Sequence, residues 1–334
     1  MGDYDLTVLD QYPIEVKEVR KVRGAMLCET EEGPLLLCEA SLSQARVLVL
    51  EKIHSAMKEQ GQMETDELIM NKDGSYISVT EDGTKYYLKK WFRGKECDVR
   101  KTGELLEAAK NLAKLHRILR FPEVSSGFPA SDLAEEFGKH NRELKKVRTF
   151  IRKKTVKGEF ETKFLECFQL MYDVAVSAEQ GLLESGYEKI RWEAKEQGCL
   201  IHGEYNYHNL IVMAGGEIRV VNFEHFCTDI QAADLYYFLR KVMEKHQWNS
   251  KLGAEIMRAY TAVNPLSEEE KKYLALRLSY PEKFWKCANT YYNSNKAWIS
   301  TKSVEKLRVS IEQTEMKKRF LEQIFSFHLG KSSV

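Results

Sequence analysis

The segment CLIHGEYNYHNLIVMAGGEIRVVNFEHF, residues 199–226, contains the most informative spacing of polar residues in the chain. His202 is followed two positions later by an acid, Glu204, and seven positions later by an amide, Asn209. Two short apolar runs then flank the turn at 214–217, a pattern that predicts a β-hairpin. The segment therefore predicts a loop with one carboxylate and one amide, followed directly by two antiparallel strands.

The chemistry that this loop fits is phosphoryl transfer. Such a loop needs one carboxylate to receive the proton of the acceptor hydroxyl, and an amide oxygen and a second carboxylate to hold the magnesium ions that neutralise the phosphates. Glu204 and Asn209 stand at the first two positions. Thirteen residues after Asn209, the third position holds Asn222, and Glu224 follows two residues later.

With this spacing the segment resembles the aminoglycoside phosphotransferase and choline kinase superfamily, whose loop reads H-G-D-x-x-x-x-N and is followed by a hairpin and an I-D-F/W element. The resemblance implies that Glu204 stands at the position of the catalytic aspartate, with His202 and Asp234 as supports of the loop rather than catalytic groups. It also implies that Asn209 and Asn222 stand at the metal-binding positions.

Further stretches are similar to the CotS-related spore coat proteins of endospore-forming Firmicutes, a kinase-like family. They are residues 86–94, the run AKNLAKLH at 109–116 and the run SYPEKFWKCANTYYNSNKAW at 279–298, and the similarity covers roughly residues 15–325. It implies synthesis in the cytoplasm, a place in the spore coat, and other coat proteins or a small-molecule ligand as partners. The aromatic residues of the last run lie at helical spacing and also predict core packing.

The order of the predicted elements fits an α+β, bilobal protein-kinase-like fold. We expect residues 1–92 to form a small lobe, a five-stranded antiparallel sheet with one helix at 42–60, and residues 93–334 to form a larger, mostly helical lobe that carries the hairpin. The helix at 42–60 is expected to place four apolar residues on one face: Leu48, Val49, Ile53 and Met57. Short β-type runs lie at 14–22, 25–30, 34–39, 67–71, 75–80 and 85–91. Helical patterns lie at 104–119, 131–153, 160–185, 230–246, 250–262, 267–276, 281–293 and 302–325.

Charge and cysteine content exclude several functions. The net charge of +1 gives no reason to expect nucleic acid or a membrane as a partner, and no apolar run approaches the roughly 20 residues of a membrane helix. The basic stretch at 139–157 has nine Lys or Arg and one Glu; we interpret it as a solvated helix face, with a patch for an anionic ligand as the alternative. The start of the chain is acidic, unlike a signal peptide. The seven cysteines are scattered without zinc spacing, which predicts reduced cysteines in a cytosolic protein.

Three chemical positions depart from the superfamily pattern. Glu204 carries its carboxylate one methylene further out than aspartate, and a displacement of about 1 Å can cost on the order of 100-fold in rate. Asn222 replaces a magnesium-binding carboxylate by a neutral amide; Glu224 could substitute for it, because strand alternation would put both on one face.

The third departure concerns cofactor binding. Cys38 stands where these families have the lysine that binds the α- and β-phosphates, and its neutral thiol offers no positive charge. Glu51, the expected partner of that lysine on the following helix, would then lack one. Trp91 belongs to the expected connection between the lobes. An alternative register makes Lys89 the phosphate-binding lysine; we reject it, and expect Lys89 to lie beside the lobe connection without reaching the cleft.

Together these departures predict a spore-coat-associated, kinase-like protein that is impaired or inactive as a phosphotransferase and acts by binding or assembly, with no cofactor. The first alternative is an active, ATP- and magnesium-dependent small-molecule phosphotransferase with an atypical metal site. The second is a binder of a sugar or another small ligand, unrelated to nucleotides. The sequence identifies neither a phosphate acceptor nor an oligomeric state.

Overall fold

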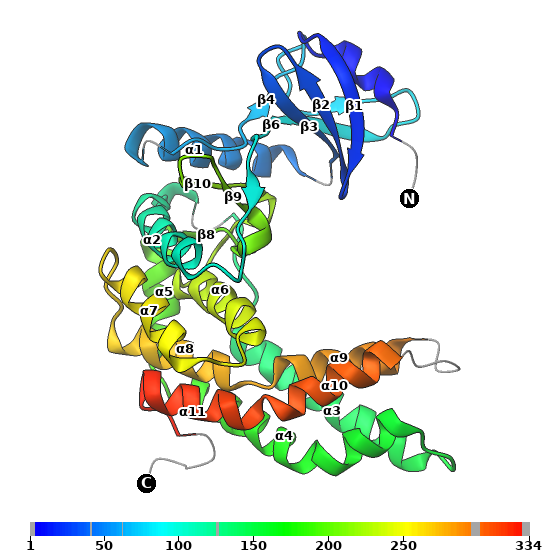
Figure 1. The fold of residues 1–334 in the computed structure, drawn as a ribbon, viewed down its shortest axis with the longest axis vertical. Coiled ribbons are helices and arrows are strands. Elements are labelled where there is room, and N and C mark those ends of the chain that lie inside the picture. The colour runs from blue at the N-terminus through cyan, green and yellow to red at the C-terminus, as the bar shows by residue number, and fades with distance from the viewer. Residues whose placement is uncertain (1–3, 41, 62, 125–126, 295–300, 329–334) are drawn as a thin grey trace. The chain divides into compact units, whose positions relative to one another are not determined.

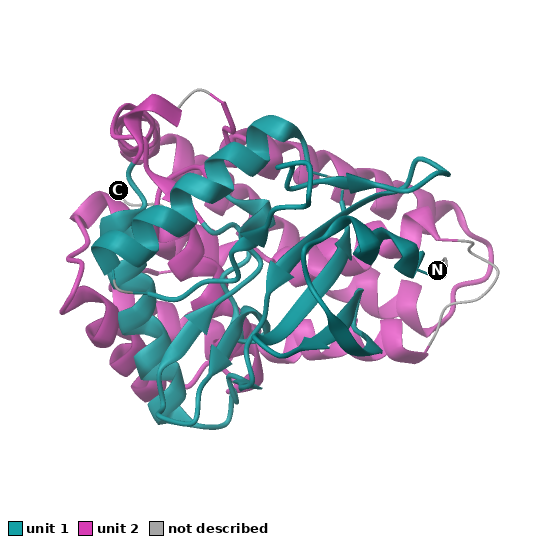
Figure 2. Ribbon diagram, turned by 90° about the horizontal axis from the view of Figure 1, so that it is seen from above, with its two compact units in different colours: residues 1–120, 202–226 teal, residues 121–201, 227–334 magenta. Residues whose placement is uncertain are grey.

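The computed structural model describes residues 4–40, 42–61, 63–124, 127–294 and 301–328, and Figure 1 labels its helices and strands. The chain forms two compact units, which Figure 2 colours separately. Unit 1 comprises residues 1–120 and 202–226, and unit 2 comprises residues 121–201 and 227–334. An antiparallel sheet in the first unit and a mostly helical remainder confirm the predicted α+β class. The predicted lobe boundary at residue 92 stays a prediction.

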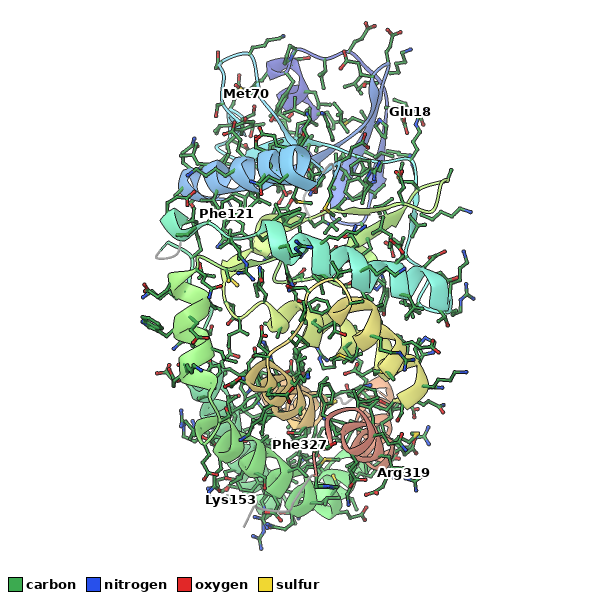
Figure 3. All side chains as sticks on the ribbon, turned by 90° about the vertical axis from the view of Figure 1, so that its left-hand side faces the viewer. Glu18, Met70, Phe121, Lys153, Arg319 and Phe327 are labelled. Atoms are coloured by element: carbon green, nitrogen blue, oxygen red, sulfur yellow. The ribbon has the colours of Figure 1, made fainter. Side chains whose placement is uncertain are left out.

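Unit 1 contains a six-stranded antiparallel sheet, where five strands were predicted. The order is β1-β2-β3-β6-β4, and β5 also pairs with β6. All six β-type runs of the sequence form strands. The sheet accommodates six of them because the two short strands β4 and β5 pair with the same edge of β6: β4 pairs with Leu88 and Lys89, and β5 pairs with Lys85 and Tyr86. The strands are β1 (Val16–Val22), β2 (Ala25–Thr30), β3 (Gly33–Glu39), β4 (Leu68–Ile69), β5 (Ser78–Val79) and β6 (Lys85–Lys90). Figure 3 shows Glu18 on β1 and the exposed Met70 just after β4.

The two faces of this sheet have different contents. Because side chains alternate along a strand, Tyr86 and Leu88 of β6 join one apolar cluster, which also contains residues of the 3₁₀ helix η1 (Leu6–Gln11). Tyr87 and Lys89 point to the opposite face. Strand β3 pairs with β6 so that Cys38 lies opposite Tyr87. Cys38 packs against a second apolar cluster, on that face of the sheet. The pairing thus places Cys38 and Lys89 on the same side of the sheet.

Two helices of unit 1 agree with the predicted ranges, with one error. Helix α1 (Gln44–Gly61) buries Val49, Ile53 and Met57 as predicted, but Leu48 is 51% exposed, so its assignment to the buried face is wrong. The inward face instead includes Val47 and His54. Helix α2 (Thr102–Ile118) buries an apolar stripe and His116.

The predicted hairpin is present in unit 1, and it is part of a three-stranded sheet. Strands β9 (Leu210–Val212) and β10 (Ile218–Val220) pair antiparallel, and β7 (Lys95–Glu96), which the sequence analysis missed, pairs with β9. The 3₁₀ turn η3 (Tyr207–Asn209) precedes the hairpin and η4 (Phe223–His225) follows it. Because β10 ends at Val220, the expectation that Asn222 and Glu224 lie on one strand face is wrong; Asn222 adopts a left-handed conformation (φ 66°, ψ 54°).

Unit 2 is helical apart from a two-stranded ribbon of β8 (Leu200–Ile201) and β11 (Cys227–Thr228) and the short 3₁₀ turn η2 (Pro122–Val124). Helix α5 was not predicted, and the helix expected at 302–325 is two helices that meet at Gln313. Among the described residues, no helix is long and apolar enough to cross a membrane. The helices are α3 (Leu133–Lys153), α4 (Glu159–Leu183), α5 (Tyr187–Glu196), α6 (Ala232–Lys245), α7 (Ser250–Thr261), α8 (Glu268–Ser279), α9 (Glu282–Asn293), α10 (Thr301–Glu312) and α11 (Thr314–Phe325).

Aromatic side chains form much of the core of unit 2. Phe284 of α9 stacks on Phe164 of α4 with ring centroids 5.0 Å apart, and Tyr291 stacks on Phe160 at 4.6 Å. Core packing of the run 279–298 is thereby confirmed for its buried aromatics; its residues 295–298 lie outside the described residues. The basic stretch follows the solvated side of α3, whose apolar residues are buried, which confirms the interpretation as a solvated helix face.

Candidate functional site

The ammonium group of Lys89 is the centre of a buried polar cluster in unit 1. Lys89 is 2% exposed, and its Nζ lies 2.8 Å from Asp66 Oδ2, 2.5 Å from Glu224 Oε1 and 2.7 Å from Asn222 Oδ1. Three oxygens therefore surround one cation. Two of them belong to carboxylates, so the cluster carries one negative charge in excess when all its groups are ionised.

Asp66 also fixes the backbone of Asn222, and Asn209 fixes its side chain. The Asn222 N–H donates to Asp66 Oδ2 at 2.8 Å, and its Nδ2 donates to Asn209 Oδ1 at 2.9 Å. A left-handed conformation is one that asparagine and aspartate tolerate better than other residues with side chains. The conformation turns the chain after the hairpin, so that Asn222 and Glu224 reach the same ammonium without belonging to one strand.

The protonation states of Lys89 and Glu224 depend on their contact with each other. Burial alone would lower the pKa of Lys89, but Asp66 and Glu224 raise it above its ordinary value. Burial alone would raise the pKa of Glu224, but the charge and hydrogen bond of Lys89 hold it below its ordinary value. The Tyr87 hydroxyl also donates to Glu224 Oε1, at 2.8 Å. Lys89 is therefore a cation and Glu224 an anion at neutral pH.

His202 supports the loop, as the resemblance implies. Its Nδ1 accepts from the Glu204 N–H at 3.1 Å, so the ring proton lies on Nε2, which donates to the Val221 carbonyl oxygen at 2.9 Å. The imidazole is fully buried, and its centroid lies 4.6 Å from that of Phe223. One side chain thus joins the two ends of the segment that contains the hairpin.

Asn209 and Glu204 have different surroundings. Asn209 Nδ2 donates to the Glu204 carbonyl oxygen at 2.9 Å, and its Oδ1 accepts from Asn222, so both polar atoms of the amide are engaged. Within the described part of the chain, no hydrogen bond or ion pair involves the carboxylate of Glu204, and the residue is half-buried. Its carboxylate is therefore available to a ligand.

The loop passes the turn η4 so closely that Gly203 admits no side chain. Gly203 has φ +84°, and a Cβ at this position would lie 2.3 Å from the His225 carbonyl oxygen. We expect Gly203→Ala to destabilise the protein by about 1–3 kcal/mol, the cost of a strained backbone, in urea unfolding. Gly215→Ala, where a Cβ meets nothing within 4 Å, is the matched control. Equal unfolding midpoints for the two variants would contradict the close approach.

Cys38 and Trp91 lie at one edge of the cluster. Burial raises the pKa of the Cys38 thiol to about 11 despite the nearby Lys89 ammonium, so the thiol is neutral. Trp91 packs with Cys38 against Ala25, Leu27 and related apolar residues of the sheet. The indole ring centroid lies 5.9 Å from the Lys89 ammonium. Of the three residues assigned to cofactor binding, the structure brings these two together.

Glu51, the third, does not join the cluster. It is exposed on α1, and its Oε1 accepts from the Tyr76 hydroxyl at 2.8 Å. His54, one turn later, faces inward instead: its Nε2 lies 3.8 Å from Asp66 Oδ1. Neither of these two buried atoms has a hydrogen-bond partner among the described residues. Burial lowers the pKa of His54, although Asp66 opposes the shift.

The expectation that Lys89 stays away from the site is wrong. Lys89 does lie near the end of β6, but its side chain extends to Asn222 and Glu224 rather than staying beside the lobe connection. The alternative register would pair Lys89 with Glu104 or Glu107 of α2; among the described residues these acids pair with Lys101 and Lys110 instead. The cation missing at Cys38 is thus present in the same cluster, supplied by the strand that pairs with β3.

Asp234 is the remaining residue that the sequence analysis assigned to the site, and Tyr205 and His208 are two further side chains of the loop that contains Glu204. Asp234 is buried in the first turn of α6, in unit 2. In unit 1, Tyr205 is fully buried and donates to the Ala108 carbonyl oxygen at 2.8 Å, while His208 is exposed beside Glu96.

The donor set does not fit a bound magnesium ion. Magnesium needs near-octahedral oxygen ligands, usually with one or two carboxylates. At the three candidate positions, Asn209 Oδ1 accepts from Asn222, Asn222 Oδ1 accepts from Lys89, and Glu224 Oε1 accepts from Lys89 and Tyr87. An ammonium group already lies where the Asn222 and Glu224 oxygens converge. Among the described residues there is also no group of three or more His, Cys, Asp or Glu that could hold a metal ion.

Two residues of the cluster were missed by the sequence analysis. Asp66 lies in the irregular segment 63–67, where no periodic pattern marks a buried acid. His54 lies one turn from Glu51, and the apolar stripe of Ile53 and Met57 gave a signal for its inward face. Lys89 was not missed but was rejected as a site residue, although strand alternation puts its side chain on the same face of the sheet as that of Tyr87.

Comparisons with known proteins agree with this geometry. A model of the family described as "Spore coat putative kinase YutH" matches residues 6–324. Spore coat protein S of Bacillus subtilis (strain 168) is 24% identical over 335 residues, which cover 95% of this chain and 92% of that protein. The resemblance to the CotS-related spore coat proteins is confirmed.

Solved structures show the same fold. The aminoglycoside phosphotransferase of Alicyclobacillus acidocaldarius subsp. acidocaldarius DSM 446 superposes with a TM-score of 0.87 at 16% identity, covering 97% of this chain and 96% of that one. The spectinomycin phosphotransferase in complex with ADP and spectinomycin has a TM-score of 0.68 at 11% identity, covering 95% and 97%. The match of the family model over nearly the whole chain shows that the protein belongs to the YutH family of kinase-like spore coat proteins.

Proposed function

We propose that this protein is a catalytically impaired phosphotransferase homologue that acts in the spore coat by binding other coat proteins or a small ligand. The observation that carries the proposal is the position of Lys89: its ammonium bonds to Asn222 Oδ1 and Glu224 Oε1, the oxygens that a metal-dependent phosphotransferase would use. The ammonium of Lys89 thereby occupies the oxygens that would otherwise bind a metal ion. The neutral Cys38 thiol on the paired strand adds no charge for phosphate.

The proposal predicts that the protein does not bind magnesium-ATP measurably. Charged contacts contribute about 1.5–3 kcal/mol each where desolvated, and this chain lacks a lysine at Cys38 and a carboxylate at Asn222. At about 1.4 kcal/mol per tenfold, affinity falls roughly a hundredfold or more. We expect no heat of binding in calorimetry with protein at roughly tens of micromolar, and no phosphate release above background. Low-micromolar, magnesium-dependent binding would contradict the proposal.

A working phosphotransferase with an atypical site is the second candidate. The observation in its favour is the carboxylate of Glu204, which no described residue engages and which follows the braced His202. In that case Lys89 would supply the phosphate-binding charge. Turnover of ATP that Glu204→Gln abolishes would establish this function, and turnover that Glu204→Gln leaves unchanged would come from a contaminant.

A further inference from the structure

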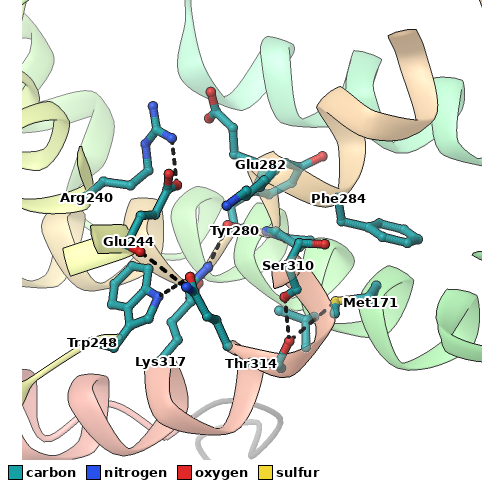
Figure 4. A pocket seen from close by; sticks show the side chains of 15 residues that line it. Met171, Arg240, Glu244, Trp248, Tyr280, Glu282, Phe284, Ser310, Thr314 and Lys317 are labelled. Carbon is teal, nitrogen blue, oxygen red and sulfur yellow. Dashed lines mark hydrogen bonds and ion pairs between the residues drawn. The ribbon is translucent and has the colours of Figure 1, made fainter. Parts of the chain in front are cut away.

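Unit 2 contains a pocket that the proposed function does not use. It lies between the end of α6, the start of α9 and the junction of α10 and α11 (Figure 4). Its cavity volume is about 50 Å³, several times the roughly 10–15 Å³ that one water molecule needs. Apolar side chains form its walls, among them Met171, Trp248 and Phe284. The cavity therefore admits a polar group of a few heavy atoms, with apolar surface around it.

Lys317 brings a cation into this pocket without a carboxylate partner. Its Nζ donates to the Tyr280 carbonyl oxygen at 2.9 Å and lies 5.5 Å from the centroid of the Trp248 ring. No carboxylate of the described residues lies within ion-pair distance of it. Since an ammonium group has three donors, two remain for a bound molecule.

The acids that line the pocket are paired with other cations. Glu244 Oε1 accepts from Arg240 at 2.9 Å, and Glu282 Oε1 pairs with Lys286 at 2.6 Å. Arg240 is 8% exposed, and its Nε is a buried donor with no hydrogen-bond partner among the described residues. The pocket thus contains one cation in excess and a second unsatisfied donor.

The turn after α6 holds the aromatic wall in place at a cost in backbone strain. Gln247 and Trp248 are consecutive residues with left-handed backbone (φ 49° and 57°), a conformation that costs roughly 1–3 kcal/mol for a residue with a side chain and is concentrated at functional sites. Trp248 Nε1 donates to Gln313 Oε1 at 3.3 Å, and Gln313 Nε2 donates to the Glu244 carbonyl oxygen at 3.2 Å. These bonds orient the indole beside Lys317.

We propose that this pocket binds a small organic carboxylate, with the carboxylate on the ammonium of Lys317 and the apolar body on the side of the pocket that Trp248 lines. The charge favours an anion, the cavity limits the anionic group to a few atoms, and the aromatic wall favours an apolar body. A multiply charged phosphate fits less well, because Glu244 and Glu282 lie close by. The pocket shares no lining residue with the cluster around Lys89, so this proposal does not depend on whether that cluster supports phosphoryl transfer.

Binding at this site should depend on pH. Burial lowers the pKa of Lys317 to about 7; Glu244 opposes the shift, Arg240 adds to it, and Glu282 opposes it. Lys283 also lines the pocket. The carboxylate binds the protonated amine, so its affinity falls as pH rises through 7. Between pH 6 and pH 8 the protonated fraction falls about tenfold, and affinity should fall by the same factor.

Calorimetry with sodium benzoate, on the full chain at constant ionic strength, tests the proposal. We expect saturable binding at pH 6, about tenfold weaker binding at pH 8, and none with benzamide, the uncharged analogue. Lys317→Met should abolish binding, whereas Lys318→Met, a neighbour on α11 that does not line the pocket, should keep it.

Several outcomes would overturn the proposal. They are no binding of benzoate at pH 6, equal binding at pH 6 and 8, equal binding of benzamide, or unchanged binding by Lys317→Met. The pH series and the benzamide arm use the unaltered protein, so they decide even if Lys317→Met fails to fold. None of these outcomes bears on magnesium-ATP, so this proposal and the proposed function fail separately.

Discussion

Lys89→Met is expected to destabilise the protein by about 3–5 kcal/mol, the usual consequence of removing one partner of a buried ion pair. Asp66 and Lys89 are each 2% exposed, and the side chain of Glu224 is 16% exposed. Without the ammonium, two carboxylates remain beside each other in a site with little access to water. Methionine keeps most of the volume of the stem, so the loss reports the charge rather than a cavity. Urea unfolding at pH 7 measures it.

Lys90→Met is the matched control on the same strand. Lys90 Nζ lies 2.7 Å from Glu67 Oε2, but the lysine side chain is 49% exposed and the glutamate 25%. Exposed pairs of this kind contribute about 0–1 kcal/mol. Replacing either of two adjacent lysines removes an ion pair of similar length, but the loss of unfolding free energy should be several-fold larger for Lys89→Met than for Lys90→Met. Equal losses of stability would show that Lys89 is not the centre of a buried cluster.

The loss from Lys89→Met should also depend on pH. In the unaltered protein the pKa of Glu224 is held below its ordinary value, so its contribution to stability is complete above the unfolded pKa and is lost as pH falls through the folded value. In the variant, burial without the cation raises the pKa of the same carboxylate, which is then protonated more easily in the folded state. The stability difference between the two proteins should shrink from pH 7 to pH 5. A difference that stays constant would mean that lost packing dominates.

The elements of unit 1 could be predicted well because turns mark their ends. The β-type runs of the small sheet become β1 to β6, and the turn at 214–217 becomes a hairpin, since glycine and polar residues separate apolar runs at these places. Shorter or less clearly bounded elements were missed. Strand β7 consists of two exposed charged residues, Lys95 and Glu96, which show no apolar alternation, and no glycine or proline marks the break between α10 and α11 at Gln313.

The composition of the candidate site was harder to predict because it depends on pairing between segments far apart. Asn209 and Asn222 were found from local spacing together with the family resemblance, and Cys38 from the resemblance alone. Lys89 was placed wrongly because its position depends on the register of β6 against β3, which no single segment determines. Asp66 has no local signal, since it lies in irregular chain and its partners, Lys89 and the Asn222 backbone, are distant in the sequence.

If Cys38 stands at the phosphate-binding position, as the resemblance implies, a lysine placed there should confer nucleotide binding. The triple change Lys89→Met, Cys38→Lys and Asn222→Asp places a lysine on β3 and a carboxylate at the end of the hairpin, and removes the ammonium that occupies the oxygens. Aspartate tolerates the left-handed conformation of position 222 about as well as asparagine. With two charged contacts regained at about 1.5–3 kcal/mol each, magnesium-ATP affinity should rise roughly a hundredfold or more. Calorimetry measures it.

The partial variants separate the contributions. Cys38→Lys alone adds a second ammonium that can balance the excess carboxylate of the cluster, but it leaves Lys89 bound to Asn222 and Glu224, so we expect no binding. Phosphoryl transfer by the triple variant should stay slow until Glu204→Asp shortens the remaining acid, a correction of about 1 Å that is worth on the order of 100-fold in rate. The rate of phosphoryl transfer is measured as the release of phosphate from ATP.

Asn222→Asp alone is the most informative of the set, because it leaves Lys89 in place. If Lys89 blocks the site, the new carboxylate adds a second excess negative charge to the cluster and loses the bond from Asn222 Nδ2 to Asn209, so we expect lower thermal stability and no affinity for magnesium-ATP. If Lys89 instead serves as the phosphate-binding lysine, the single change completes the metal site, and magnesium-dependent ATP binding appears at once. The second result would reject the impaired phosphotransferase, and Lys89 would replace the lysine missing at Cys38.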